Sequence, residues 1–412
     1  MAGRDAAHSG AADGPGPPYR EAWSRDVGLG GPVAGPVVAR DAVVVVAARG
    51  VVALGPATGE VLWEMDRSEG PAGTPAVVGE LVVHASGSES SGALVARNLE
   101  DGIEAWRAFV DGSVPGGLVA SGGLVYAGTT EGTVVAVEAG TGEERWRSDV
   151  EGRIEATPAV AGGLVLVASE NRQTGMTTLY ALDAERGPGD GPATWRFSPP
   201  NPSAPASAPA SAGRRAFLAT SDGAVRAVDL ETGEEAWAAE LRATVSDRQV
   251  PAAGSVLVVT DRLHVYGLDA NGGGELWVFR LADLRALPDG RTNTLGASSP
   301  AVSEGAAVIG DASGVLSAVD LGSGRRVWMG DIGPGPVGAV AVGSEHIFAA
   351  SLGPEGSVVG LERDPDGALL DEVSPTTLFP LQAFLNFLIA LVAVGVPLLV
   401  LSRLALRRRA AP

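Results

Sequence analysis

Residues that could carry out chemistry are few in this sequence and lie far apart. The chain of 412 residues contains no cysteine and no lysine, which excludes thiolate nucleophiles, cysteine-ligated zinc, lysine Schiff bases and P-loop phosphate sites. Its histidines are His8, His84, His264 and His346, and none is spaced like a HExxH or paired metal-ligand motif. We therefore expect no catalytic residue, no metal site, and strand histidines whose ring nitrogens are hydrogen-bonded.

Two further features argue against a nucleotide or nucleic-acid ligand. Residues 333–338, GPGPVG, fit the GxGxxG phosphate-loop pattern, but two prolines and the missing strand–helix context favour a turn. The formal net charge is −19, although Arg403, Arg407, Arg408 and Arg409 lie near the C-terminus. So acidic a chain repels the phosphate backbone, and we expect no nucleic-acid partner.

The residues that recur at a regular spacing are tryptophans, 40 to 51 positions apart. They are Trp23, Trp63, Trp106, Trp146, Trp195, Trp237, Trp277 and Trp328. Short apolar runs precede most of them, such as PAV and LVVHAS, and each unit can be divided into four strands. A period of this length is typical of propeller blades, which stack to bury a core that one four-stranded sheet lacks. The sequence therefore predicts an all-β fold.

The phrase around most tryptophans resembles the pyrroloquinoline-quinone (PQQ) type β-propeller repeat, Ala-x-Asp-x-x-Thr-Gly-x-x-x-Trp. Ala227, Asp229, Thr232, Gly233 and Trp237 fit every position. Six looser copies stand in register with it between positions 20 and 370. The resemblance implies that each tryptophan lies flat between adjacent blades, over the alanine of a neighbouring motif, with its indole N–H bonded to a backbone carbonyl. Such tryptophans are structural docking residues.

The number of blades follows from the two ends of the repeat. After Trp328 three further strand-like runs occur, but Asp371 stands where the next tryptophan is due. Trp23 has no preceding strands. We predict an eight-bladed β-propeller of four-stranded antiparallel blades over residues 20–373, with the N-terminal strand closing the eighth blade and residues 1–19 forming a flexible arm. In the alternative, GALLDEV (367–373) closes that blade itself.

Proteins with the repeat that this sequence resembles divide into quinoprotein dehydrogenases and non-catalytic scaffolds such as BamB-like propellers. Many alcohol-oxidising quinoproteins carry adjacent cysteines against the cofactor, which this chain lacks. We therefore expect a non-catalytic scaffold for protein interaction or envelope assembly, with no cofactor. A PQQ- and calcium-dependent dehydrogenase is the alternative, and a ligand sensor that signals through a partner protein is a third.

Insertions distinguish the blades from one another. They lie at 87–93, 170–178, 198–206 and 282–297, all in B-to-C or D-to-A connections, which emerge on one face of a propeller. Loops on a rigid scaffold commonly carry binding residues. The candidates on this loop face are Arg153, Glu155, Arg248 and Gln249 at the mouth of the central channel, and Arg172, Arg285 and Arg291 in the loops.

The C-terminal region predicts a membrane anchor. Residues 378–401 carry no charge, and about 20 apolar residues suffice to span a bilayer as a helix. A linker (374–377) precedes this transmembrane helix and a basic tail (402–412) follows it. The positive-inside rule places the tail in the cytoplasm and the propeller outside, in contact with envelope or membrane proteins. Because the N-terminus lacks a signal-peptide core, either the true start lies upstream or the propeller is cytoplasmic; we favour the first.

Overall fold

The computed structural model forms two units, Met1–Leu369 and Leu370–Pro412. It describes residues 11–12, 14–28, 35–39, 41–47, 49–66, 73–88, 91–187, 193–205, 207–241, 245, 252–253, 256–260, 264–281, 298–333, 335–351 and 356–370. The predicted linker, transmembrane helix and basic tail lie outside these residues. Within the described ranges, no helix has the length and apolarity needed to cross a membrane.

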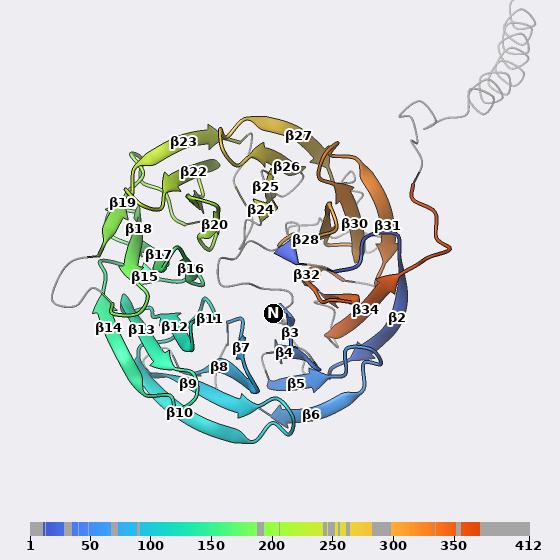
Figure 1. Cartoon of the computed structure of the whole chain (residues 1–412), viewed down its shortest axis with the longest axis horizontal. Coiled ribbons are helices and arrows are strands. Elements are labelled where there is room, and N and C mark those ends of the chain that lie inside the picture. The colour runs from blue at the N-terminus through green and yellow to red at the C-terminus, as the bar shows by residue number, and fades with distance from the viewer. Residues whose placement is uncertain are drawn as a thin grey trace, which may run out of the picture. The chain divides into compact units, whose positions relative to one another are not determined.

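The first unit is a ring of eight antiparallel sheets, which confirms the predicted all-β, eight-bladed propeller (Figure 1). Each blade has four strands, called A to D from the centre of the ring to its rim. Blade 1 comprises β3 (Val37–Val38), β4 (Val43–Ala47), β5 (Gly50–Leu54) and β6 (Val61–Asp66); blade 2, β7 (Ala76–Val78), β8 (Leu81–Ser88), β9 (Ser91–Asn98) and β10 (Glu104–Asp111); blade 3, β11 (Val119–Ser121), β12 (Leu124–Gly128), β13 (Thr133–Glu138) and β14 (Glu144–Asp149); blade 4, β16 (Ala159–Ala161), β17 (Leu164–Asn171), β18 (Met176–Asp183) and β19 (Trp195–Phe197).

The remaining blades follow in chain order, and the last borrows its outer strand from the N-terminus. Blade 5 comprises β20 (Ala210–Ala212), β21 (Arg215–Ala219), β22 (Ala224–Asp229) and β23 (Glu235–Glu240); blade 6, β24 (Ala252–Ala253), β25 (Val256–Thr260), β26 (His264–Asp269) and β27 (Glu275–Arg280); blade 7, β28 (Ala301–Ser303), β29 (Ala306–Gly310), β30 (Val315–Asp320) and β31 (Arg326–Asp331); blade 8, β32 (Val337–Val342), β33 (His346–Ser351), β34 (Ser357–Arg363) and β2 (Tyr19–Asp26). Two short strands are additional: β1 (Ala11–Ala12) pairs with β28, and β15 (Arg153–Ile154) pairs with β17.

Ring closure occurs as predicted, through the N-terminal strand. Strand β2 pairs antiparallel with β34, and Trp23 stands opposite Gly360. The alternative closure by residues 367–373 is wrong, because the outer neighbour of β34 is β2. The two ends of the propeller are therefore joined by hydrogen bonds within one sheet.

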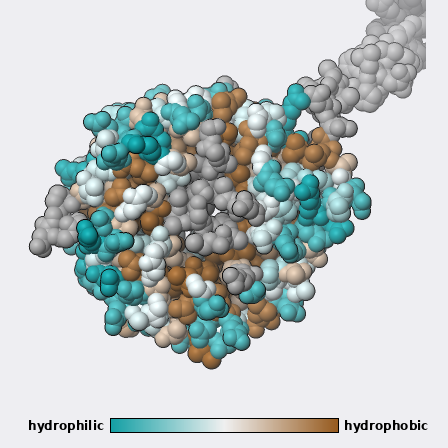
Figure 2. All heavy atoms as spheres, in the orientation of Figure 1, coloured by the Kyte–Doolittle hydropathy of each residue, from teal (hydrophilic) through white to brown (hydrophobic). Residues whose placement is uncertain are grey.

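The core lies between the blades rather than within one of them. Strand β4 is buried along its whole length, because both faces of a middle strand pack on neighbouring blades, and this explains its unbroken run of valines. One apolar cluster, for example, joins Val83 and Leu94 of blade 2 to Val125 and Val135 of blade 3. Hydrophilic residues predominate at the rim (Figure 2), where charged side chains on the outer strands discourage edge-to-edge aggregation.

Seven of the tryptophans donate an indole hydrogen bond to a backbone carbonyl in the next blade. The acceptors are Pro56 for Trp23 (2.9 Å), Leu99 for Trp63 (2.6 Å), Ala139 for Trp106 (2.8 Å), Ala184 for Trp146 (3.0 Å), Leu230 for Trp195 (2.8 Å), Ala270 for Trp237 (3.1 Å) and Leu321 for Trp277 (2.7 Å). Each bond links one blade to the next in the same direction around the ring.

The small residues that pack against the tryptophan rings differ from the neighbouring alanines that the resemblance implies. The motif alanine is the cross-strand partner of the tryptophan of its own blade, as Ala136 is of Trp146. The next blade contributes the glycine of its C-to-D turn: a Cβ on Gly142 would lie 2.5 Å from Cε3 of Trp106. That glycine has a φ of 73°, so the turn and the ring both require the absence of a side chain.

We expect Gly142→Ala to lower the free energy of unfolding by about 3 kcal/mol, since a left-handed alanine and an overpacked contact each cost about 1–2 kcal/mol. Gly163→Ala is the matched control, because Gly163 has a φ of 77° but no atom within 4 Å of an added Cβ. It should cost about 1 kcal/mol. Denaturant titrations measure both values, and equal losses would show that the contact with Trp106 contributes nothing.

Blade 8 has no C-to-D turn, and a tyrosine fills the equivalent place. Tyr19 packs edge-on against Trp328, with 5.0 Å between ring centroids, and its hydroxyl donates to the Pro15 carbonyl at 3.1 Å. Burial raises the pKa of Tyr19 above its ordinary value. The Ser303 hydroxyl donates to the same carbonyl at 3.0 Å, and the Gly16 N–H donates to Glu304 Oε2 at 3.1 Å. The segment before β2 is thereby held against blade 7.

Candidate functional site

Two blades carry long hairpins on the loop face. The insertions at 87–93 and 170–178 extend the B and C strands, so that β8, β9, β17 and β18 have 8 residues each, whereas β12 has 5. The insertion at 198–206 is held at its end by hydrogen bonds, including Ala204 N–H to Ser221 Oγ at 3.2 Å. The insertion at 282–297 lies outside the described residues.

Strand β15 explains how the loop face of blade 4 is built. It lies in the D-to-A connection and pairs with the far end of β17, Arg153 with Glu170 and Ile154 with Ser169. Ile154 is fully buried, and a Cβ on Gly128 would lie 2.3 Å from its Cγ2. This packing against blade 3 fixes the two residues on either side of Ile154 at the surface.

Three sequence-predicted binding residues meet at this place. Arg153 Nε lies 3.3 Å from Glu155 Oε1, and Arg172 Nη2 lies 3.0 Å from the same oxygen. The side chains of Arg153, Glu155 and Arg172 are 35%, 49% and 63% exposed, so their ion pairs add little stability. Two guanidinium groups share one oxygen of a single carboxylate, which leaves unused N–H donors. We call these three residues the arginine cluster.

The other sequence-predicted binding residues lie outside the described residues; they are Arg248, Gln249, Arg285 and Arg291. Of the predicted binding residues, the structure describes Arg153, Glu155 and Arg172, and all three belong to the arginine cluster.

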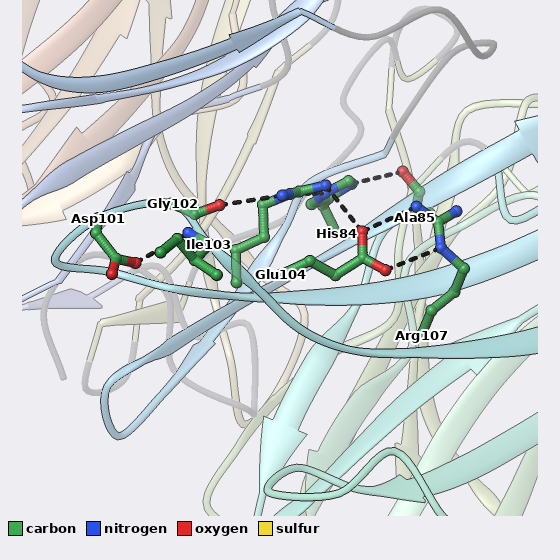
Figure 3. A network of polar contacts seen from close by, with 8 residues as sticks. His84, Ala85, Asp101, Gly102, Ile103, Glu104 and Arg107 are labelled. Atoms are coloured by element: carbon green, nitrogen blue, oxygen red, sulfur yellow. Dashed lines mark hydrogen bonds and ion pairs between the residues drawn. The ribbon is translucent and has the colours of Figure 1, made fainter.

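Sequence reasoning missed a second polar network, on blade 2 near its C-to-D turn (Figure 3). Arg97 joins three partners: Nε donates to His84 Nε2 at 3.3 Å, Nη1 to the Gly102 carbonyl at 3.0 Å, and Nη2 to Glu104 Oε2 at 3.1 Å. Arg107 binds the same carboxylate through Nε at 3.1 Å and Nη2 at 3.0 Å. The residues come from three adjacent strands, and only their pairing in the blade brings them together.

His84 is held in this network as the predicted satisfied strand histidine. His84 is 1% exposed, and its Nδ1 lies 3.1 Å from the Ala85 carbonyl, so both ring nitrogens have partners and the tautomer with Nδ1 protonated fits them. Burial lowers the pKa of Arg97, whereas the hydrogen bond from Arg107 lowers the pKa of Glu104. A buried, fully bonded histidine of this kind stabilises a blade rather than reacting with a ligand.

We expect Glu104→Gln to lower the free energy of unfolding by about 1–2 kcal/mol, because Arg97, with 12% of its side chain exposed, loses a charged partner. The control is Glu144→Gln, which loosens an exposed pair with Arg147 in blade 3 and should cost less than about 0.5 kcal/mol. Since the folded-state pKa of Glu104 is depressed, its contribution is present above the unfolded pKa and is lost as the pH falls through the folded value. Urea titrations at neutral and acidic pH measure both effects.

Among the described ranges, no three His, Asp or Glu side chains are grouped so that they could hold a metal ion. We derive no reaction step through a calcium–PQQ cofactor.

The chain resembles known proteins in sequence and in fold. The chain matches the family model described as outer membrane protein assembly factor BamB over residues 19–116, 90–243 and 175–352. Outer membrane protein assembly factor BamB of Yersinia pestis is 29% identical over 116 residues, which are 28% of this chain and 28% of that protein.

Solved structures share the fold at low sequence identity. BamB from Moraxella catarrhalis has a TM-score of 0.66 and 17% identity, with 85% of this chain and 99% of that chain covered. Quinohemoprotein alcohol dehydrogenase ADHIIG from Pseudomonas putida HK5 has a TM-score of 0.67 and 13% identity, with 86% and 78% covered. These likenesses concern the fold alone. Because the family model spans most of the propeller, the chain belongs to the PQQ-like propeller family whose model is described as outer membrane protein assembly factor BamB.

Proposed function

We propose that this protein is a membrane-anchored, non-catalytic propeller that acts as an interaction or assembly scaffold in the cell envelope. Membership of a family described by an assembly factor supports this role. The observation that carries it is the arginine cluster: three exposed polar side chains, fixed by the extra strand β15 and an extended hairpin, on the face where the blades differ. Its surplus guanidinium donors suit acidic side chains or backbone carbonyls of a protein partner.

The binding role is tested with the double variant Arg153→Ala/Arg172→Ala. After chemical cross-linking in native membranes, we expect the partners that co-purify with the unchanged protein to be strongly depleted. The matched control is Arg145→Ala/Arg214→Ala, whose arginines are 57% and 73% exposed and also form exposed ion pairs. Unchanged recovery of partners by the first variant would overturn the role of the cluster.

The anchor is tested by truncation. We expect the full-length protein to sediment with membranes and to be released only by detergent, whereas a form that ends at Ser374 should stay in the supernatant. The physical reason is the uncharged stretch 378–401, which the shorter form lacks. Fractionation followed by immunoblotting measures the distribution, and a truncated protein that remains in the membrane pellet without aggregating would contradict the proposal.

The non-catalytic part of the proposal has its own test. Titration of the purified protein with PQQ and calcium should show no saturable binding, and alcohols or sugars should not be oxidised in a dye-linked assay. Saturable binding together with dye reduction would establish the quinoprotein alternative instead.

A further inference from the structure

A pocket of about 570 Å³ lies between blades 3 and 4. Asp149 and Glu151 line it from the end of blade 3, and Tyr180, Leu182 and Arg196 line it from blade 4. Its volume is within the range of about 300–1,000 Å³ that is typical of small-molecule sites. The outer strand of blade 4, β19, has only 3 residues, whereas β14 in blade 3 has 6. The outer strand of blade 4 therefore covers less of the rim than the outer strand of blade 3 does.

Tyr180 is the residue that suggests a ligand. It is 7% exposed, yet its hydroxyl has no hydrogen-bond partner among the described residues and is not one of the fully enclosed polar atoms. Tyr19 and Tyr126, by contrast, donate to the carbonyls of Pro15 and Ala184. Buried tyrosine hydroxyls usually have a partner. Tyr180, which lines the pocket, therefore has a hydroxyl with an unused donor and unused acceptor capacity.

The position of Tyr180 is apolar in the neighbouring blade. Tyr180 stands opposite Arg196 in the sheet of blade 4, and Val135 stands opposite Arg147 at the same place in blade 3. Val135 is 1% exposed, whereas the same register holds the buried Arg226 in blade 5 and the buried Tyr266 in blade 6. Packing between blades therefore accepts polar and apolar side chains at this register, and blade 3 shows that it does not require a hydroxyl.

The charged groups around the pocket retain hydrogen-bonding capacity. Asp149 Oδ1 accepts from Thr133 Oγ1 at 2.9 Å, and Glu151 Oε1 accepts from Asn171 Nδ2 at 2.9 Å, which leaves the second oxygen of each carboxylate without a bond to the described residues. Arg196 has no ion-pair partner in the described part of the chain. The pocket thus combines acceptors, guanidinium donors and a hydroxyl with the apolar surfaces of Tyr180 and Leu182.

This combination of side chains indicates the chemical class of the ligand. Two carboxylates against one guanidinium disfavour an anionic ligand, and the three charges disfavour a purely apolar one. A neutral polyhydroxylated ring satisfies both requirements, since its C–H face packs on an aromatic side chain while its hydroxyls pair with carboxylates and guanidinium. We propose that the pocket between blades 3 and 4 binds a saccharide. The proposal goes beyond the scaffold function and does not depend on it.

The test uses the full-length protein in a detergent whose headgroup is not a sugar. Saturation-transfer NMR and calorimetry are run with glucose, N-acetylglucosamine, maltotriose and the trisaccharide of N-acetylglucosamine. The two monosaccharides and two trisaccharides distinguish a site for a free sugar from one for a glycan chain. We expect saturable binding of at least one of the four, and it should saturate at one ligand per protein.

Variants then locate the binding. We expect Tyr180→Phe, which removes only the hydroxyl, to weaken affinity about fivefold, as the loss of one hydrogen bond does. Arg196→Ala should weaken it about tenfold or more. The control Arg145→Ala, outside the pocket on blade 3, should leave it unchanged. All three proteins should keep the melting temperature of the unchanged protein within a few degrees.

Three results would overturn the proposal. The first is no saturable binding of any of the four saccharides at 10 mM, a concentration of the order at which weak sugar sites fill. The second is binding that Tyr180→Phe and Arg196→Ala leave unchanged. The third is equal weakening by Arg145→Ala, which would place the site elsewhere. Loss of partner cross-links by the arginine-cluster variant is a separate measurement, so failure of one proposal is distinguishable from failure of the other.

Discussion

A form of the protein that begins at Gly28 should aggregate, or melt more than about 10 °C below the full-length protein, since a loss of several kcal/mol shifts the midpoint of a domain of this size by 2–4 °C per kcal/mol. The deletion removes β2 and exposes the edge of β34. It also removes Trp23, which lies 5.9 Å from the ring of Phe348 and donates to the Pro56 carbonyl of blade 1. An unpaired edge and an empty gap between blades both destabilise the ring.

A form that begins at Pro18 is the control for this deletion. It retains β2 and Trp23 but loses the bonds that Pro15 and Gly16 make with Tyr19, Ser303 and Glu304. We expect it to remain monomeric with a decrease of only a few degrees in melting temperature. Differential scanning calorimetry and size-exclusion chromatography measure both forms. If the Gly28 form melted with the full-length protein, β2 would not be what closes the ring.

We expect Trp146→Ala to lower the free energy of unfolding by about 3–5 kcal/mol, the usual loss for a buried tryptophan. Trp146 is 8% exposed, donates to the Ala184 carbonyl at 3.0 Å and covers Gly187, where an added Cβ would meet the ring at 2.8 Å. The variant leaves a cavity at the junction of blades 3 and 4, whereas the Ala184 carbonyl keeps the hydrogen bond from the Tyr126 hydroxyl. Denaturant unfolding followed by circular dichroism measures the loss.

Two controls separate the causes. Trp146→Phe keeps most of the ring volume and removes the N–H, and it should cost roughly half as much. Phe109→Ala removes an aromatic side chain that is 75% exposed on β10 and should change the stability by less than about 0.5 kcal/mol. A change below about 1 kcal/mol for Trp146→Ala would mean that this tryptophan does not dock the blades.

The sequence predicts the ring because the spacing of its repeated Ala…Trp motif reflects contacts between neighbouring strands. Ala136 and Trp146 are ten positions apart and pair directly, so the spacing of the motif is the geometry of strands C and D. No strand-like runs precede Trp23, which indicates that the segment around it is the outer strand that blade 8 needs. The pairing of Ala11 with Val302 has no such local signal, because it joins segments that are distant in the chain and only two residues long.

The candidate site is predictable in part for the same reason. Arg153 and Arg172 belong to connections that emerge on one face, so their approach follows from topology, but their sharing of Glu155 depends on the extra strand β15. The expected contact of each tryptophan with a neighbouring alanine is replaced by a turn glycine, because pairing fixes the alanine within its own blade. Tyr180 carries no pattern at all. Its significance depends on the absence of a hydrogen-bond partner among the described residues, which only the structure reveals.

Because β2 closes the ring, the propeller can be completed only after the chain has been synthesised as far as β34. Strand β2 emerges from the ribosome before its partner β34, which follows roughly 330 residues later, and this takes tens of seconds at about 5–20 residues per second. During that interval β2 has no sheet to join. Arg20, Glu21, Arg25 and Asp26 are exposed even in the finished blade, and in the nascent chain the same charges keep a strand with one tryptophan soluble and discourage its pairing with the wrong edge. Strand β2 can therefore join its blade only after β34 has been synthesised.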